Sequence, residues 1–264
     1  NASYFEAIDI FNIDEHVKYA DALVNKGIKI VGVLAAGIDA PETMARVAEH
    51  LNLPSVSTDI AHLVNNKELF RIEMKKLGVP VPKFHILTKD VLKHLPEIID
   101  EIGYPLIVKN TSSSGSRGTK IFYSPDYDGV YSMAEEAINV SRSKKGLIES
   151  LWNGSEHTVE TLYDVNGKYH RCFITDRLFD KSDGFAIETG LVHPSKLTNL
   201  EQNEMYLLAE KVSNAIGINH GAAKFDMIQT EDGPRIIEMT VRLSGGFDCQ
   251  YLVPIATGKN ILKA

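Results

Sequence analysis

The chain has 264 residues, 44% of them hydrophobic and 24% charged, which suits a folded protein with a substantial core and excludes a wholly disordered one. Its 35 acidic residues outnumber the 28 basic ones, and the formal net charge of −7 disfavours nonspecific nucleic-acid binding, which needs a basic surface. Two cysteines and no C-x-x-C pair exclude a disulfide framework and a cysteine zinc site, and no apolar run is long enough to span a membrane, so we expect a cytoplasmic protein.

Residues 1–80 alternate short apolar runs with helical patterns. The run 29–35 (KIVGVLA) is β-branched and apolar, as buried parallel strands are. A helical pattern over 41–51 and a second short strand at 53–57 follow it. This order predicts a β-α-β unit of an open parallel sheet, and a helix at 66–78 with the two prolines after it marks the end of this domain.

The next segment, 81–146, has a different pattern. A strand at 105–110, a polar loop and a strand at 119–124 predict a hairpin, and an amphipathic helix is expected from about 126 to 143. Residues 147–264 then predict mostly alternating strands (LIESL, EHTVETLY, KYHRCFIT, FAIETGLVH), a helix at 199–216 and a hairpin of HGAAKFDMIQT and RIIEMTV. The final residues resemble the start of a helix, so we expect the sequence to be part of a longer protein.

The loop SSSGSRG at 112–118 is the first candidate site. Consecutive backbone N–H groups of a Ser/Gly loop can point at one anion, and Arg117 adds positive charge. Lys109 ends the preceding strand and becomes a phosphate partner if the loop binds phosphate. The alternatives are a plain hairpin tip and a surface lysine.

Two carboxylates on apolar strands form the second candidate site. Asp226 and Glu238 are twelve residues apart across a predicted hairpin, and burying such groups is costly unless they bind a cation. Their oxygens suit Mg²⁺, whereas two solvent-facing acids on an edge hairpin are the alternative. Arg242, four residues after Glu238, can neutralise a transferring phosphoryl group or form a structural salt bridge.

A third candidate is the segment LIESLWNGSEHTVETL at 147–162. The predicted strand is broken at Asn153-Gly154, and Glu149 and Glu156 flank the break. A broken strand exposes unpaired backbone groups that can read an adenine edge, whereas an ordinary hairpin is the alternative.

Taken in order, LGVPVPKF, LIVKNTSSSGSRG, LIESL, GSEHTVETL and AKFDMI…IIEMTVRLSGG resemble the ATP-grasp superfamily over almost the whole chain. Biotin carboxylase, carbamoyl-phosphate synthase and the L-amino-acid ligases look similar, and the stretch from HTVETL to HPSKL looks most like the amino-acid ligase branch. The resemblance implies an α/β (α+β ATP-grasp) fold. It comprises a partial open parallel-sheet pre-ATP-grasp domain (1–80), a small lid subdomain (81–146) and a main subdomain (147–264), whose C-terminal part we expect to be truncated.

The resemblance also implies roles for individual residues. Asp226 and Glu238 would hold Mg²⁺, with Mn²⁺ as an alternative, and Arg242 would contact the transferring phosphate or the substrate anion. Thr240 stands where the family usually has a metal-binding Asn, and a hydroxyl is a poorer metal ligand than an amide carbonyl. The implied ATP-binding residues are Lys67, Lys109, Ser112, Ser113, Ser114, Gly115, Ser116, Arg117, Gly118, Glu149, Ser150, Leu151, Trp152 and Glu156.

The implied activity is that of an ATP-dependent ligase, which activates a carboxylate as an acyl phosphate for attack by an amine. A bicarbonate-phosphorylating enzyme of the biotin carboxylase or carbamoyl-phosphate synthase type is one alternative. A regulatory domain that binds ATP without turnover is another, supported by Thr240. The expected partners are small-molecule acids and amines, a second copy in a homodimer, and further domains of the full-length protein, with neither nucleic acid nor a membrane.

Overall fold

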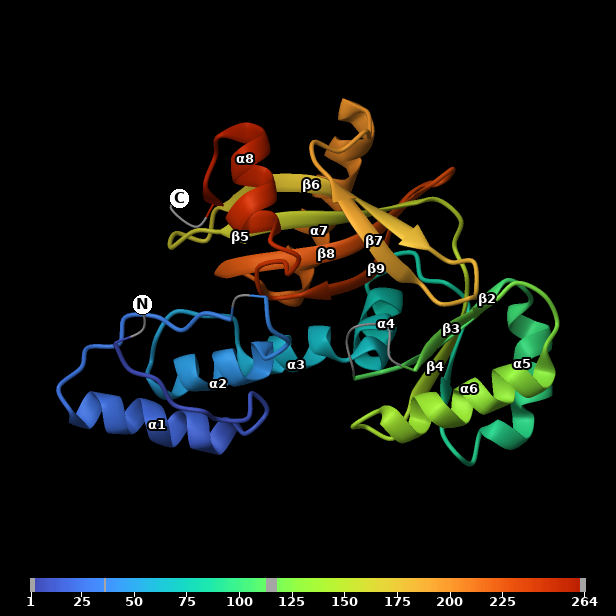
Figure 1. Ribbon diagram of the computed structural model, residues 1–264, viewed down its shortest axis with the longest axis horizontal. Helices are drawn as coiled ribbons and strands as arrows, with labels where there is room; N and C mark the ends of the chain where they lie inside the picture. The colour runs from blue at the N-terminus through green and yellow to red at the C-terminus, as the bar shows by residue number, and fades with distance from the viewer. Residues whose placement is uncertain (1–2, 36, 113–117, 262–264) are drawn as a thin grey trace.

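The computed structural model describes residues 3–35, 37–112 and 118–261 (Figure 1). Within these residues the chain begins with a helical region and continues through two antiparallel sheets. In Figure 1 the helical region and the first sheet lie side by side beneath the second sheet. Among the described residues, no helix is both long and apolar enough to cross a membrane.

The N-terminal region consists of helices whose starts are set by local capping. The Asn66 side chain, for example, accepts hydrogen bonds from the backbone N–H groups of Glu68 and Leu69 and so begins the fourth helix. The helices are α1 (Ile13–Asn25), α2 (Pro41–His50), α3 (Thr58–Asn65) and α4 (Lys67–Lys76).

The strands expected in this region are absent from its described residues, and that part of the prediction is wrong. Residues 29–35 and 53–57 pair with no other described segment. Val31 and Leu34 leave 75% and 69% of their surfaces exposed. An apolar run becomes a strand only when a neighbouring strand satisfies its backbone groups, and here the neighbouring described elements are helices.

The first sheet, which we call the small sheet, has the strand order β1-β4-β2-β3. The expected hairpin is confirmed, because β2 and β3 pair antiparallel with Lys109 opposite Thr119. Leu106, Val108 and Ile148 point from the sheet into a core shared with two helices. The elements are β1 (Phe84–Leu87), η1 (Leu92–His94), α5 (Leu95–Ile102), β2 (Leu106–Asn110), β3 (Thr119–Phe122), α6 (Tyr127–Val140) and β4 (Gly146–Ser150).

Strand β4 pairs with β1 and β2, so it is part of the small sheet. The predicted boundary between 146 and 147 assigned this strand to the main subdomain, and the prediction is wrong on this point. Alternation along LIESL does not show which sheet provides its neighbours, because the partner strands come from distant parts of the sequence.

The second sheet, the large sheet, has the order β7-β6-β5-β8-β9, with α7 packed on one face (Figure 1). A capping box of Thr198 and Glu201 begins α7, and Gly217 in the left-handed conformation ends it. The elements are β5 (Ser155–Tyr163), β6 (Tyr169–Asp180), β7 (Ile187–Val192), α7 (Asn199–Ile216), β8 (Gly221–Thr230), β9 (Gly233–Thr240), η2 (Asp248–Leu252) and α8 (Val253–Thr257).

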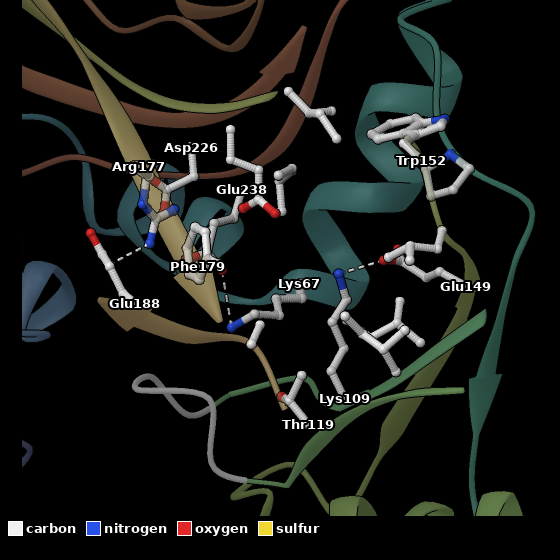
Figure 2. A pocket seen from close by; sticks show the side chains of 18 of the residues that line it. Lys67, Lys109, Thr119, Glu149, Trp152, Arg177, Phe179, Glu188, Asp226 and Glu238 are labelled. Carbon is white, nitrogen blue, oxygen red and sulfur yellow. Dashed lines mark hydrogen bonds and ion pairs between the residues drawn. The ribbon is translucent and has the colours of Figure 1, made fainter. Parts of the chain in front are cut away.

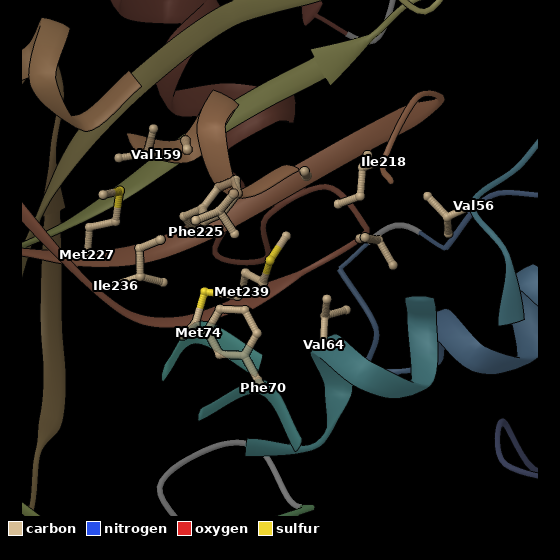
Figure 3. Close-up of a cluster of buried hydrophobic side chains, with 14 of the residues drawn as sticks. Val56, Val64, Phe70, Met74, Val159, Ile218, Phe225, Met227, Ile236 and Met239 are labelled. Atoms are coloured by element: carbon tan, nitrogen blue, oxygen red, sulfur yellow. The ribbon is translucent and has the colours of Figure 1, made fainter. Parts of the chain in front are cut away.

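The core of the large sheet extends to the helical region. Figure 3 shows Phe70 and Met74 of α4 beside Met239 of β9, in the same buried cluster as Phe225 of β8. Phe70, Met74 and Phe225 are each exposed by 1% or less. Helix α4 is therefore fixed to the large sheet, and its first residue, Lys67, is held near β9.

A bulge in the hairpin of β8 and β9 decides which side chains face away from this core. Strict alternation would place Ile236 and Glu238 on the same face. The register shifts between Asp226 and Met227, so Ile236 lies opposite Met227 while Glu238 lies opposite Asp226. Both carboxylates consequently project from the face opposite the core, as the hairpin pattern predicted for a convergent pair.

Candidate active site

A cavity of about 610 Å³ lies between the small sheet, the large sheet and α4 (Figure 2). Seven basic and six acidic side chains line it, and the acidic ones each contact a basic one. The basic residues are Lys67, Arg71, Lys109, Arg177, Lys181, Lys224 and Arg242, and the acidic ones are Asp39, Glu149, Glu156, Glu188, Asp226 and Glu238.

A buried ion cluster forms the end of the cavity nearest the small sheet. Glu149 of β4 accepts hydrogen bonds from Arg71 of α4, with Nε 2.5 Å from Oε1 and Nη2 3.3 Å from Oε2. Lys109 of β2 forms an ion pair with the same carboxylate (Figure 2). Burial would raise the pKa of Glu149, but the two cations outweigh it and lower that pKa to about 2. Burial lowers the pKa of Lys109.

Arg71 also joins the three parts of the fold. Its Nη1 and Nη2 donate to the carbonyl oxygens of Ile236 and Ile237 in β9, at 3.1 and 2.9 Å. One guanidinium therefore links α4 to a strand of each sheet. Because it satisfies buried acceptors on all sides, it fixes the position of Lys109 relative to the carboxylates of β8 and β9.

The paired carboxylates Asp226 and Glu238 lie on the floor of the cavity. Lys67 Nζ is 3.3 Å from Glu238 Oε2, and this lysine is the main reason that the pKa of Glu238 lies well below its usual range. Arg177 Nη1 is 3.0 Å from Asp226 Oδ2, and Lys224 Nζ is 2.6 Å from Asp226 Oδ1. Both carboxylates thus lie among cationic side chains.

The segment between the two sheets runs from Leu151 to Gly154, directly after the last residue of β4, Ser150. Ser150 N donates to Lys83 O at 2.9 Å, and Leu151 N donates to Pro105 O at 3.0 Å. Both N–H groups are therefore paired with backbone carbonyl oxygens. Ser150, Leu151 and Trp152 nevertheless line the cavity, and the Arg71 guanidinium lies 5.9 Å from the centre of the Trp152 ring.

Glu156 and Arg242 both line the cavity, and both already have charged partners. Lys181 Nζ lies 2.5 Å from Glu156 Oε1. Arg242 Nη2 donates to Asp39 Oδ1 at 2.6 Å, which brings a loop of the helical region to the end of β9. Their roles toward ribose and phosphate remain predictions.

Three of the predicted residues do not line this cavity. The Ser112 hydroxyl accepts from Arg142 N at 2.8 Å and lies at a smaller neighbouring cavity. Gly118 accepts at its carbonyl from Asn110 N, and Thr240 has a buried hydroxyl without a hydrogen-bond partner among the described residues. The predicted residues Ser113, Ser114, Gly115, Ser116 and Arg117 lie outside the described residues.

Arg71, Arg177, Lys181 and Lys224 are site residues that the sequence analysis did not identify. Lys224 and Asp226 are two residues apart on β8, so alternation along AKFDMI could have placed Lys224 on the face of the carboxylates. Arg177 lies opposite Glu156 in the register of β5 and β6, a pairing that no local pattern reveals.

The carboxylates fit one divalent cation. Hard oxygen ligands suit Mg²⁺, which commonly binds one or two carboxylates together with substrate phosphates. Among the described residues, no group of three or more His, Cys, Asp or Glu side chains is arranged to hold a metal ion. Asp226 and Glu238 are the carboxylates that lie opposite each other at the cavity, and Thr240 does not line it.

Comparisons with known proteins agree with this architecture. A family model of the ATP-grasp domain matches residues 102–250. The carbamoyl phosphate synthase large chain of Clostridium beijerinckii is 29% identical over 225 residues, covering 82% of this chain and 20% of that protein. An uncharacterised protein of Sinorhizobium fredii is 26% identical over 257 residues, covering 93% of this chain and 50% of the relative. The chain therefore spans half or less of the length of these two relatives.

Two solved structures share the fold. The L-amino acid ligase of Bacillus licheniformis superposes with a TM-score of 0.75 at 20% identity, covering 96% of this chain and 59% of that one. The second is the biotin carboxylase domain of the Hydrogenobacter thermophilus 2-oxoglutarate carboxylase, solved with MgADP and bicarbonate. It superposes with a TM-score of 0.75 at 22% identity, covering 97% of this chain and 57% of that one.

Proposed function

Because the chain belongs to the ATP-grasp family, we propose that it is the ATP-binding and catalytic part of a ligase that joins a carboxylate to an amine. The observation that carries the proposal is the position of the cations. Lys67, which contacts Glu238, and Lys109 line the same cavity between the two sheets as the carboxylates of Asp226 and Glu238 (Figure 2). A triphosphate with a divalent cation complements this distribution, because its phosphates match the lysines and its cation matches the carboxylates.

The rest of the cavity suits the nucleoside. Trp152, Leu151 and Ile107 offer apolar contacts for a base, and Glu156 offers acceptors for ribose hydroxyls. We propose that the small sheet with α5 and α6 acts as the lid subdomain, and the large sheet with α7 as the main one. In this proposal ATP lies between them.

Asp226 and Glu238 would hold Mg²⁺, which neutralises phosphate charge and orients the phosphates when it is bound. The residues of the chain then position the reaction. A carboxylate oxygen attacks the γ-phosphorus of ATP, the bond from that phosphorus to the bridging oxygen breaks, and ADP leaves. Lys67 and Lys109 stabilise the charge that moves onto ADP, and Arg242 holds the incoming acid.

In the second step the amine attacks the carbonyl carbon of the acyl phosphate. Inorganic phosphate leaves with the electron pair of the C–O bond, and the nitrogen loses one proton to solvent. The amide product retains no phosphate, so each turnover releases one ADP and one phosphate. We place the protein in the cytoplasm in this proposal, and homodimer formation and further domains remain part of it.

A nucleotide-binding domain without turnover is the second candidate. It is favoured by Thr240, whose buried hydroxyl does not line the cavity. ADP release distinguishes the two. The protein with ATP and Mg²⁺ is assayed against single amino acids, pairs of amino acids and bicarbonate. We expect amino acids to stimulate ADP release. Stimulation by bicarbonate alone would indicate a carboxylase-type enzyme, and binding of ATP without any stimulation would support the second candidate.

The Glu238→Gln variant tests the metal assignment. It removes the charge of one cation ligand at constant shape, so we expect the rate of ADP release to fall by about 10²- to 10³-fold, the range for loss of one transition-state charge partner. Glu231→Gln, in the exposed turn between β8 and β9, is the matched control. Unchanged turnover in the Glu238 variant would contradict the assignment.

A further inference from the structure

Lys224 contacts one of the two carboxylates that would hold a metal ion in the proposed function. It projects from β8 into the cavity, two residues before Asp226, and its Nζ lies 2.6 Å from Asp226 Oδ1. Its side chain is 14% exposed, so its charge is only weakly screened by water. The other oxygen of the same carboxylate, Oδ2, contacts Arg177.

The strand register fixes where this ammonium group lies. Asp226 is opposite Glu238, and in the next cross-strand row Lys224 is opposite Thr240 on β9 and Glu160 on β5. Lys224 therefore lies directly beside the carboxylate pair, over the position where Thr240 would have to supply a ligand. The Thr240 hydroxyl is buried and does not line the cavity.

The neighbouring carboxyl group does not change this arrangement. Both oxygens of Glu160 accept a hydrogen bond from Ser244 N, at 3.2 Å each, so they are directed to the segment after β9. Among the described residues, the cavity thus offers two carboxylates for divalent ions at this point. Three of the four oxygens of that pair already contact a cation. Asp226 Oδ1 contacts Lys224, Asp226 Oδ2 contacts Arg177, and Glu238 Oε2 contacts Lys67.

We propose that the Lys224 ammonium takes the place of a second divalent cation, so that the site binds one metal ion with each nucleotide. This inference rests on the proposed function, because it assumes a bound triphosphate. A second dication at this point would lie against the Lys224 ammonium, and like-charge repulsion disfavours that arrangement. Lys224 is then a direct charge partner of the phosphoryl group as its bond to the bridging oxygen breaks.

Counting metal ions tests the proposal without requiring turnover. The protein is saturated with the β,γ-imido analogue of ATP, and bound Mn²⁺ is counted from the loss of the electron paramagnetic resonance signal of free Mn²⁺. We expect one Mn²⁺ per bound nucleotide in the wild-type protein. We expect two in Lys224→Asn, because that change removes the ammonium and adds an amide oxygen.

Lys181→Met is the matched control, because Lys181 is a cavity lysine that contacts Glu156 instead of the metal carboxylates. We expect it to bind one Mn²⁺. Two Mn²⁺ in the wild-type protein would overturn the inference and leave the proposed function standing, and this result does not depend on the folding of any variant. One Mn²⁺ in a folded Lys224→Asn protein would also overturn it. Absence of nucleotide binding would overturn the proposed function itself.

Discussion

Replacing Glu149 by Gln should expose how strongly the buried ion cluster stabilises the fold. The side chains of Arg71 and Glu149 are 2% and 3% exposed, and that of Lys109 is 8% exposed. The amide of the variant keeps the shape of the carboxylate but leaves both cations without a counter-charge. Breaking a buried ion pair from one side typically costs about 3–5 kcal/mol.

The pKa of Glu149 gives an independent value for the same effect. It falls from 4.5 to about 2 in the folded protein, and each pKa unit corresponds to about 1.4 kcal/mol. The ionised carboxylate therefore contributes about 3 kcal/mol to the free energy of unfolding. Because the folded pKa is lowered, this contribution is complete above pH 4.5 and is lost as the pH falls toward 2.

The measurement is urea unfolding followed by circular dichroism at several pH values. At pH 7 we expect the free energy of unfolding of Glu149→Gln to be about 3 kcal/mol lower than that of the wild type. The difference between the two proteins should shrink by about 2 kcal/mol when the pH is lowered to 3. Glu97→Gln, at an exposed position of α5, is the control and should have the same urea midpoint of unfolding as the wild type. Equal unfolding midpoints of Glu149→Gln and wild type at pH 7 would refute the reasoning.

Two further changes test buried and close-packed positions. Burial raises the pKa of Glu160 to about 8, so the wild-type free energy of unfolding should decrease between pH 4.5 and 8, because the unfolded carboxyl ionises first. Glu160→Gln should remove this decrease in urea midpoints, and an unchanged pH profile would contradict the assignment. A Cβ at Gly154 would lie 2.0 Å from the Gln229 carbonyl oxygen, so Gly154→Ala should cost about 1–3 kcal/mol in thermal unfolding. Gly32→Ala, where the added Cβ meets open space, should leave the thermal stability unchanged. Equal losses of stability in both variants would contradict the close approach at Gly154.

Local pattern predicted the large sheet and the carboxylate pair because both depend on neighbouring residues. Alternation identified the hairpin of β8 and β9, and its turn set Asp226 opposite Glu238. The bulge that lets Ile236 face the core has no comparable signature, because it depends on how the whole sheet packs.

The remaining features depend on contacts between distant segments. Arg71 and Glu149 are 78 residues apart, and their pairing arises only when α4 meets both sheets. The run at 29–35 has the composition of a strand, yet no described segment pairs with it. Composition specifies that a segment can form a strand, whereas a partner decides whether it does.

The chain enters and leaves the small sheet on the same side, through two neighbouring strands. Its first and last strands pair with each other, with Phe84 opposite Glu149, and the backbone of Lys83 and Ser150 is joined by a 2.9 Å hydrogen bond. An inserted module whose two ends already touch imposes little strain on the chain that hosts it. Residues 84–150 therefore resemble an insertion with adjoining ends, and an exchange of this segment between relatives needs crossovers only at 83 and 151, provided that the incoming segment keeps the carboxylate that pairs with Arg71.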